Sequence, residues 1–302
     1  MSGVMSPIAG AGVDAARRRH CLQGGLLAAA WLASTARAAP ARQRIVSVGG
    51  ALTEIVYALQ AQADLVGVDT TSLFPEAAQK LPSVGYARTL SAEGVLALAP
   101  TRVIATEDAG PPAVIRQLTS ASVKVSVLPA RHRFEGLCDR VQRVGNLIGR
   151  VAEARALQQR LVQQWARAQA QVAQRAGQAP RVLFVLAHAS NQTMVAGADT
   201  SAQAMLDYVG ARNVISGFSG YKPLTPEAVI AAQPELVLLT DQGLSAAGGV
   251  DGILRLPGLA HTPAGQQRRV LAMEALFLLG FGPRLPAAVA ALDAALARAM
   301  KA

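Results

Sequence analysis

One segment occurs twice in this chain, and the repeat limits the folds that the sequence can adopt. Residues 90–100, LSAEGVLALAP, align with residues 224–234, LTPEAVIAAQP, so that Glu93 matches Glu227 at an offset of 134. In each copy a Ser or Thr begins a short helix with an acid in its first turn, and Pro ends it before a strand-forming run. Any βα protein shows this order to some degree. The two prolines also precede equivalent strands of their halves, which favours a duplication and two related lobes.

The spacing of apolar residues predicts two α/β lobes and one long helix between them. Short apolar runs predict buried parallel strands: Arg44–Val48, Arg102–Thr106 and Val123–Leu128 in the first half, and Arg181–Leu186, Glu235–Thr240 and Arg269–Met273 in the second. Between them, apolar residues recur every three or four positions from Val151 to Val172, which predicts a helix of about 25 residues. Gly177 and Pro180 end it. We expect two Rossmann-like lobes with the carboxyl ends of both sheets at one ligand cleft.

The first 38 residues have the pattern of an export signal. Basic Arg17–Arg19 precede an apolar stretch that begins at Cys21, and Ala36-Arg37-Ala38 matches the small-x-small cleavage motif. Adjacent arginines leave both the general and the twin-arginine export routes open. We therefore expect an exported chain that is cleaved near Ala38. The expected parts are a signal peptide over 1–38, an N-terminal lobe over 39–149, a connecting helix over 150–177 and a C-terminal lobe over 178–302.

Composition excludes several classes of protein. The formal charge is +10 for the whole chain, and loss of the signal lowers it to +7, because four arginines and one aspartate are removed. Cys138 is then the one remaining cysteine, so an internal disulfide or a cysteine-based zinc cluster cannot form. No zinc-finger or RNA-recognition signature is present and aromatic residues are only 4%, so we do not expect nucleic acid as a partner. Outside the N-terminus, no apolar run approaches the ~18–20 residues of a spanning helix.

Motifs for catalysis are absent from the sequence. There is no Gly-x-Gly-x-x-Gly, no Walker motif, no Gly-x-Ser-x-Gly and no His-Glu-x-x-His. The histidines after the signal, His132, His188 and His261, do not have the spacing of metal ligands. His188 alone follows the end of a predicted strand, where side chains face the expected cleft. A secreted α/β enzyme acting on a polar metabolite is therefore the less favoured alternative.

The loop before the first repeated helix contains a candidate ligand-binding tyrosine. Tyr86 follows Gly85, and its phenolate is a suitable ligand for ferric iron. Arg88, two residues further on, favours the charged form of that phenol. The residues alone leave a structural role open, in which the ring is half-buried and its hydroxyl bonds to the backbone. Gly220-Tyr221 precedes the second copy of the repeat, so Tyr221 is the pseudo-equivalent residue.

Several segments together resemble the haem-specific periplasmic binding proteins of bacterial ABC importers. The segments are Arg44–Asp69, Gly85–Gly94, Val144–Arg150, Gly220–Leu224, Thr240–Leu244 and Gly280–Arg284. The motif Gly-Tyr-x-Arg before Leu-Ser-x-Glu-Gly is the part of the resemblance that is specific to the haem-binding family. Two lobes joined by a long helix also occur in vitamin B12 and siderophore binding proteins. The resemblance implies haem as the transported ligand and no catalysis, with a siderophore or corrinoid carrier as the alternative within the fold.

The resemblance also implies roles for individual residues. The axial tyrosine of the family falls on Tyr86, with Arg88 as its neighbouring cation. His188 is the candidate for a histidine of the second lobe on the opposite face of the haem, or on a second stacked haem. Tyr221 is the next haem-binding candidate.

Two acids are candidates for contact with a transporter. In the wider superfamily that this chain resembles, one glutamate per lobe docks on arginines of a two-fold symmetric permease, and Glu93 and Glu227 occupy the matched positions. The alternative is that both carboxylates only interact favourably with the helix dipole. The resemblance thus implies a periplasmic carrier, expected to be a monomer, whose partners are haem and an ABC permease dimer with its ATPase.

Overall fold

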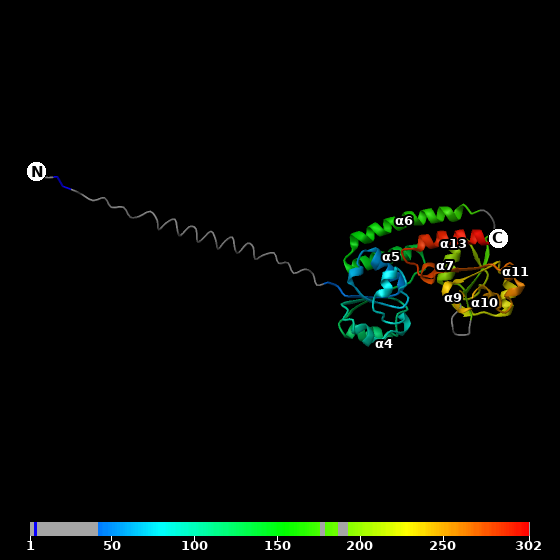
Figure 1. Cartoon of the computed structure of the whole chain (residues 1–302), viewed down its shortest axis with the longest axis horizontal. Helices are drawn as coiled ribbons and strands as arrows, with labels where there is room; N and C mark the ends of the chain where they lie inside the picture. Colours follow the sequence, from blue (N-terminus) through cyan, green and yellow to red (C-terminus); the bar gives the residue numbers. More distant parts are fainter. Residues whose placement is uncertain (1–2, 5–41, 176–178, 187–192, 302) are drawn as a thin grey trace. The chain divides into compact units, whose positions relative to one another are not determined.

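The computed structural model describes residues 3–4, 42–175, 179–186 and 193–301, and the folded body comprises Gln43–Ala302 (Figure 1). The predicted export signal with its cleavage site, Gly177 and His188 lie outside the described residues. No described helix is both long enough and apolar enough to cross a membrane.

The first lobe is built on a four-stranded parallel sheet of order β2-β1-β3-β4. Its strands are β1 (Ile45–Val48), β2 (Leu65–Val68), β3 (Arg102–Thr106) and β4 (Lys124–Leu128). Three of them were predicted to within one residue. The fourth, β2, was missed, because Gly67 interrupts its short apolar run, LVGV. The helices of this lobe are α2 (Gly50–Ala58), α3 (Ala92–Leu96), α4 (Pro112–Ser120) and α5 (Phe134–Ile148).

The second lobe has a mixed sheet of order β10-β9-β5-β6-β8, with β7 paired to β5. The predicted strands β5 (Arg181–Leu186), β9 (Leu236–Thr240) and β10 (Val270–Met273) are parallel, and β7 (Arg212–Asn213) is parallel to β5. Two short strands, β6 (Met194–Ala196) and β8 (Tyr221–Pro223), add an antiparallel edge that was not predicted. The helices are α7 (Ser201–Tyr208), α8 (Pro226–Ala232), α9 (Asp241–Ala246), α10 (Val250–Leu254), α11 (Pro263–Gln266) and α12 (Ala275–Leu279).

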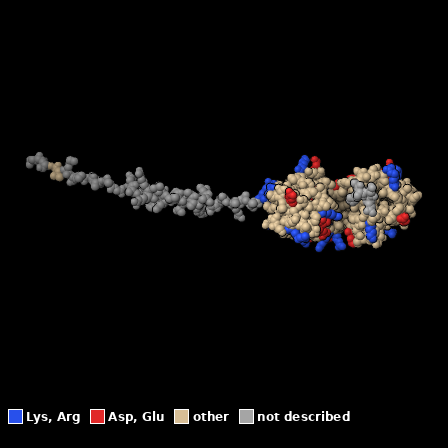
Figure 2. Space-filling view, turned by 90° about the horizontal axis from the view of Figure 1, so that it is seen from below, with Lys and Arg blue, Asp and Glu red and all other residues tan. Residues whose placement is uncertain are grey.

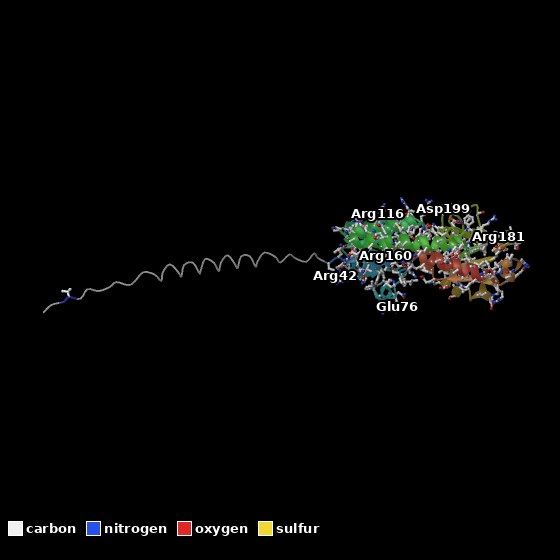
Figure 3. The ribbon with its side chains drawn as sticks, turned by 90° about the horizontal axis from the view of Figure 1, so that it is seen from above. Arg42, Glu76, Arg116, Arg160, Arg181 and Asp199 are labelled. Carbon is white, nitrogen blue, oxygen red and sulfur yellow. The ribbon has the colours of Figure 1, made fainter. Side chains whose placement is uncertain are left out.

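The predicted long helix is α6 (Val151–Ala173), which connects the two lobes (Figure 1). It follows α5 after Gly149, whose left-handed φ of 74° ends that helix. The buried stripe of α6 packs against α5 and α13 (Leu285–Ala299), and α13 lies beside α6 in Figures 1 and 3. The stripe comprises Ala154, Leu157, Leu161, Trp165 and Ala168. The architecture is therefore the predicted one, an α/β protein of two lobes joined by a single long helix.

The repeated segments have the same local structure. Ser91 Oγ accepts a hydrogen bond of 3.3 Å from Gly94 N at the start of α3, and Thr225 Oγ1 accepts one of 3.3 Å from Ala228 N at the start of α8. Each helix leads into a central strand of its sheet, β3 or β9. The helix-capping prediction is confirmed in both copies.

Candidate ligand-binding cleft

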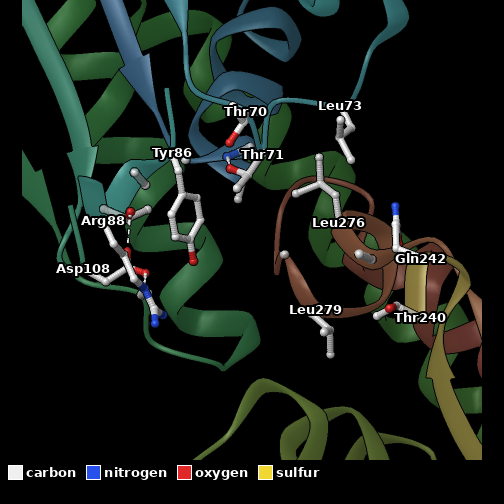
Figure 4. Close-up of a pocket in the computed structure, with 18 of the residues that line it drawn as sticks. Thr70, Thr71, Leu73, Tyr86, Arg88, Asp108, Thr240, Gln242, Leu276 and Leu279 are labelled. Atoms are coloured by element: carbon white, nitrogen blue, oxygen red, sulfur yellow. Dashed lines mark hydrogen bonds and ion pairs between the residues drawn. The ribbon is translucent and has the colours of Figure 1, made fainter. Parts of the chain in front are cut away.

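A cavity of about 520 Å³ lies between the two lobes (Figure 4). Its walls come from the carboxyl ends of strands in both sheets, where open α/β sheets bind ligands. The first lobe contributes residues that follow β1 to β4, among them Gly49, Thr70, Tyr86, Arg88, Asp108, Ala130, His132 and Arg140. The second contributes Leu186 at the end of β5, Thr240 at the end of β9, and Gln242, Leu276, Leu279 and Gly280. The predicted cleft is present.

Tyr86 presents its phenol to this cavity. Gly85 before it has a φ of +88°, a conformation that favours glycine although no neighbouring atom would meet a Cβ there. The loop is held by hydrogen bonds from Thr70 N to Gly85 O, from Thr89 N to Tyr86 O and from Gly110 N to Ala87 O, of 3.0, 2.9 and 2.9 Å. The tyrosine is 45% exposed, and its hydroxyl points into the open space in Figure 4. No hydrogen bond joins that hydroxyl to any described residue, so its oxygen is free to meet a ligand.

Arg88 lies beside Tyr86 and is bound to an acid. Its Nε donates to Asp108 Oδ2 at 3.0 Å, while Thr106 Oγ1 donates to Asp108 Oδ1 at 2.7 Å. Burial alone would raise the pKa of Asp108, but the hydrogen bonds from Thr106 and Arg88 outweigh it and lower that pKa. The hydrogen bond to Asp108 in turn raises the pKa of Arg88. Arg88 is thus a fixed cation whose charge is largely balanced by its partner.

Tyr221 occupies a different environment from Tyr86. It lies on β8, partly buried against the main hydrophobic core, and is not among the residues that line the cavity. Burial raises the pKa of the Tyr221 phenol, against the opposing effects of a hydrogen bond with Ser201 and of the Arg88 charge. Although the repeat matches the two tyrosines in sequence, only Tyr86 of this pair lines the cavity.

The wall opposite Tyr86 includes two leucines of a capped helix, beside the polar Thr240 and Gln242. Leu276 and Leu279 of α12 face Tyr86 across the cavity in Figure 4. Glu274 caps this helix, since its carboxylate accepts from Leu276 N at 2.6 Å and from Phe277 N at 2.8 Å. Gly50 approaches closely from the first lobe, where a Cβ would lie 2.7 Å from Leu276 Cδ1. The two leucines give this wall an apolar part that suits a flat hydrophobic ligand.

Two basic residues of the cavity, His132 and Arg140, were not predicted as site residues. Arg140 on α5 is only 2% exposed, and the His132 ring packs edge-on against Phe281 with 5.2 Å between ring centroids. Burial and the Arg140 charge lower the pKa of His132, so the imidazole is neutral near pH 7. Asp108 was also missed, although its place just after a predicted strand end was a usable signal. The position of Arg140, on a helix in an unremarkable stretch, offered none.

The remaining predicted residues lie away from the cavity or outside the described chain. Glu93 and Glu227 are exposed in the first turns of α3 and α8 and do not line the cavity. His188 is not described, but Leu186, two residues earlier, lines the cavity. On the face shown in Figure 2, charged side chains of both signs form small groups on a largely uncharged surface.

Comparison with known proteins identifies this architecture. The model of the periplasmic binding protein family matches residues 45–275. A solved structure of a periplasmic haem-binding protein, BhuT, in complex with two haems is 46% identical with a TM-score of 0.82, over 85% of this chain and 99% of that one.

Curated relatives are more distant. An uncharacterised ABC transporter substrate-binding lipoprotein, YvrC, of Bacillus subtilis is 25% identical over 80% of this chain and 76% of the relative. A vitamin B12-binding protein of Salmonella typhi is 26% identical over 66% of this chain and 73% of the relative. The similarity is therefore greater to the haem-binding structure than to the B12-binding protein.

Proposed function

Because this chain belongs to the periplasmic binding protein family, we propose that it captures haem between its lobes and delivers it to an ABC importer. The observation that supports haem most directly is the exposed Tyr86 phenol in a cavity whose opposite wall includes Leu276 and Leu279. The 46% identity to a haem-binding structure supports the same ligand. Members of this family bind ligands for transport, and catalysis is not part of the proposed function.

The residues of the cleft fit a ferric porphyrin. Tyr86 would bind the iron through its phenolate oxygen, a known type of haem ligation. Arg88 would favour the charged form of that ligand, while Leu276 and Leu279 would cover the apolar macrocycle. We assign the iron ligand to Tyr86 rather than to Tyr221, since only Tyr86 lines the cavity.

His188 remains the candidate for a contribution from the second lobe. It follows β5, whose last residue, Leu186, lines the cavity. A neutral imidazole is a good haem ligand, and closure of two lobes gains energy from a ligand only if both lobes contact it. His188 would bind either the other face of the iron or a second haem. Replacing it with alanine would then alter the visible spectrum or lower a stoichiometry above one.

The transport partners follow from the family. We propose that a permease dimer with its ATPase receives the loaded carrier, and that Glu93 and Glu227 are the docking acids of the two lobes. Both are exposed, and both occupy the second position of a short helix that begins with the same capping hydrogen bond. Equivalent acids on duplicated lobes suit a two-fold symmetric partner.

The proposed location is the periplasm, reached by export and cleavage near Ala38. The mature carrier would act as a monomer. It would consist of an N-terminal lobe over 39–149, a connecting helix over 150–177 and a C-terminal lobe over 178–302. The observed α6, Val151–Ala173, lies within the proposed connecting helix.

A ligand titration tests the proposed function. The mature protein is mixed separately with ferric haem, cyanocobalamin and a ferric siderophore, and binding is followed by visible absorption. We expect saturable binding of ferric haem with a tyrosinate-type spectrum. If the protein binds cyanocobalamin or the siderophore and does not bind haem, that compound replaces haem as the proposed ligand. Of these two alternatives, the similarity to a vitamin B12-binding protein of Salmonella typhi favours cyanocobalamin.

A further inference from the structure

Arg140 is a buried cation in the cleft wall that has no acidic partner in the part of the chain that the structure describes. It is 2% exposed, and its Nη2 donates to the carbonyl oxygen of Phe281 at 2.6 Å. Its Nε has no hydrogen-bond acceptor, and no ion pair joins Arg140 to a carboxylate among the described residues. Burial lowers the pKa of this guanidinium to about 10, and only the charge of Glu107 opposes that effect.

Such a group is costly in an empty cleft. Burial of a charge is unfavourable unless an opposite charge and hydrogen bonds compensate it. Glu107 does not provide this compensation directly, because it is exposed and its Oε1 accepts from Ala130 N at 3.1 Å. The Phe281 carbonyl satisfies one N–H of the guanidinium. The unpartnered Nε is shielded from solvent, so an anion in the cavity would reach the guanidinium through its Nη atoms.

Arg88, the other arginine of the cavity, differs in this respect. Its guanidinium is held by Asp108 through a 3.0 Å hydrogen bond, and the Arg88 side chain is 63% exposed. A carboxylate that enters the cleft would therefore gain more from Arg140 than from Arg88. His132, which also lines the cavity, adds a neutral imidazole near Arg140 that can donate a hydrogen bond without adding a second charge.

We propose that Arg140, supported by His132, forms a buried anion-binding subsite that receives one carboxylate of the ligand. The proposal rests on the proposed function, in which the ligand is a porphyrin with two propionates. A planar guanidinium matches a carboxylate through paired N–H···O bonds. The subsite fixes which edge of the macrocycle enters the cleft, and it completes the coordination of a cation that otherwise lacks a counter-ion.

Metal-free porphyrins test this subsite separately from iron coordination. Protoporphyrin IX and its dimethyl ester are titrated by fluorescence into the wild-type protein and into Arg140→Met. The wild type is expected to bind the diacid more tightly than the diester by about 10- to 100-fold, the range for a hydrogen-bonded charged pair. Arg140→Met should lose most of this preference, because its affinity for the diacid falls much more than its affinity for the diester.

Arg143→Met is the matched control, because Arg143 lies on the same helix, is half-exposed and pairs with Asp139. It should keep the wild-type preference. Arg140→Lys, which retains the charge, serves if the methionine variant does not fold, and should still reduce the preference several-fold because it lacks the paired geometry.

Equal losses for diacid and diester in Arg140→Met would overturn the proposal and show that Arg140 acts only through the Phe281 carbonyl. An unchanged preference in both Arg140 variants would overturn it as well. If either of these results is obtained while the wild-type protein binds ferric haem, the proposed anion-binding subsite is wrong and the proposed haem-binding function stands. If neither haem nor porphyrin binds the wild type, the proposed function fails first.

Discussion

Glu54 and Arg284 form an ion pair between the two lobes, with 2.7 Å from Glu54 Oε1 to Arg284 Nη2 across 230 positions of sequence. Glu54 lies on α2 of the first lobe with its side chain 3% exposed, and Arg284 precedes α13. Glu274 extends the pair at 3.2 Å, and the guanidinium lies 4.0 Å from the centroid of the Phe74 ring. The lobes are therefore held together by a charged network in addition to the connecting helix.

Removal of Arg284 should destabilise the fold. Arg284→Met leaves the Glu54 carboxylate buried without its cation, and loss of one partner of a buried pair costs about 3–5 kcal/mol. We expect a loss of about 3 kcal/mol in the free energy of unfolding by urea, since Arg284 itself is partly exposed. The double variant Glu54→Gln with Arg284→Met should recover part of that loss. A single variant as stable as the surface control Arg143→Met would contradict this account.

The same carboxylate should make stability depend on pH. Burial raises the pKa of Glu54 above 4.5 in the folded protein, and this effect exceeds the lowering caused by the hydrogen bond from Arg284. The folded state thus binds the proton more tightly than the unfolded chain, so stability falls as pH rises from 4.5 through the folded pKa. The free energy of unfolding, measured from pH 4 to 8 in wild type and Glu54→Gln, should show this fall only in the wild type. Parallel curves would show that Glu54 does not contribute.

Asp108 should tune the haem iron through Arg88. Asp108→Asn removes the charge that balances Arg88, which leaves more positive charge near the iron and favours its ferrous form. The reduction potential of the bound haem should rise by something on the order of tens of millivolts, and less at high salt. Arg88→Met should shift it in the opposite direction. Spectroelectrochemistry checks both signs, and shifts of the same sign in the two variants would exclude an electrostatic coupling.

The sequence was informative where a residue's role is local. The strands around β1 and β9, the caps at Ser91 and Thr225 and the apolar stripe of α6 depend on short-range patterns, and these predictions are confirmed. The edge strands β6 and β8 were missed, because strands of three residues have too few positions to show a period.

Parts of the site and of the contact between the lobes depend on long-range contacts that no local sequence pattern records. Arg140 meets Phe281 across 141 positions, and Glu54 meets Arg284 across 230. Their neighbouring sequence is that of ordinary helices. Tyr86 could be singled out because Gly85 precedes it and a cation, Arg88, follows two residues later. The different environment of Tyr221 became visible only with the tertiary structure.

The proposed docking acids, Glu93 and Glu227, should matter for transport and not for ligand binding. Glu93→Arg with Glu227→Arg places two positive charges where arginines of the permease are expected. A single exposed pair is worth ~1 kcal/mol or less, so one reversal is tolerated more readily than two. The double variant should lose importer-dependent haem uptake in reconstituted vesicles while its haem affinity in solution stays at the wild-type level. If the double variant still takes up haem through the importer, or if its haem affinity in solution falls together with uptake, Glu93 and Glu227 are not the docking residues.

The most direct measurement is the visible spectrum and affinity of the Tyr86→Phe variant with ferric haem. This substitution keeps the ring and removes only the oxygen that faces the cleft, and Tyr221→Phe is the matched control. We predict that Tyr86→Phe loses the tyrosinate-type spectrum and binds ferric haem at least about tenfold more weakly, a change of about 1.4 kcal/mol, while Tyr221→Phe keeps both properties. A Tyr86→Phe protein with the wild-type spectrum and affinity would contradict the assignment of Tyr86 as the iron ligand.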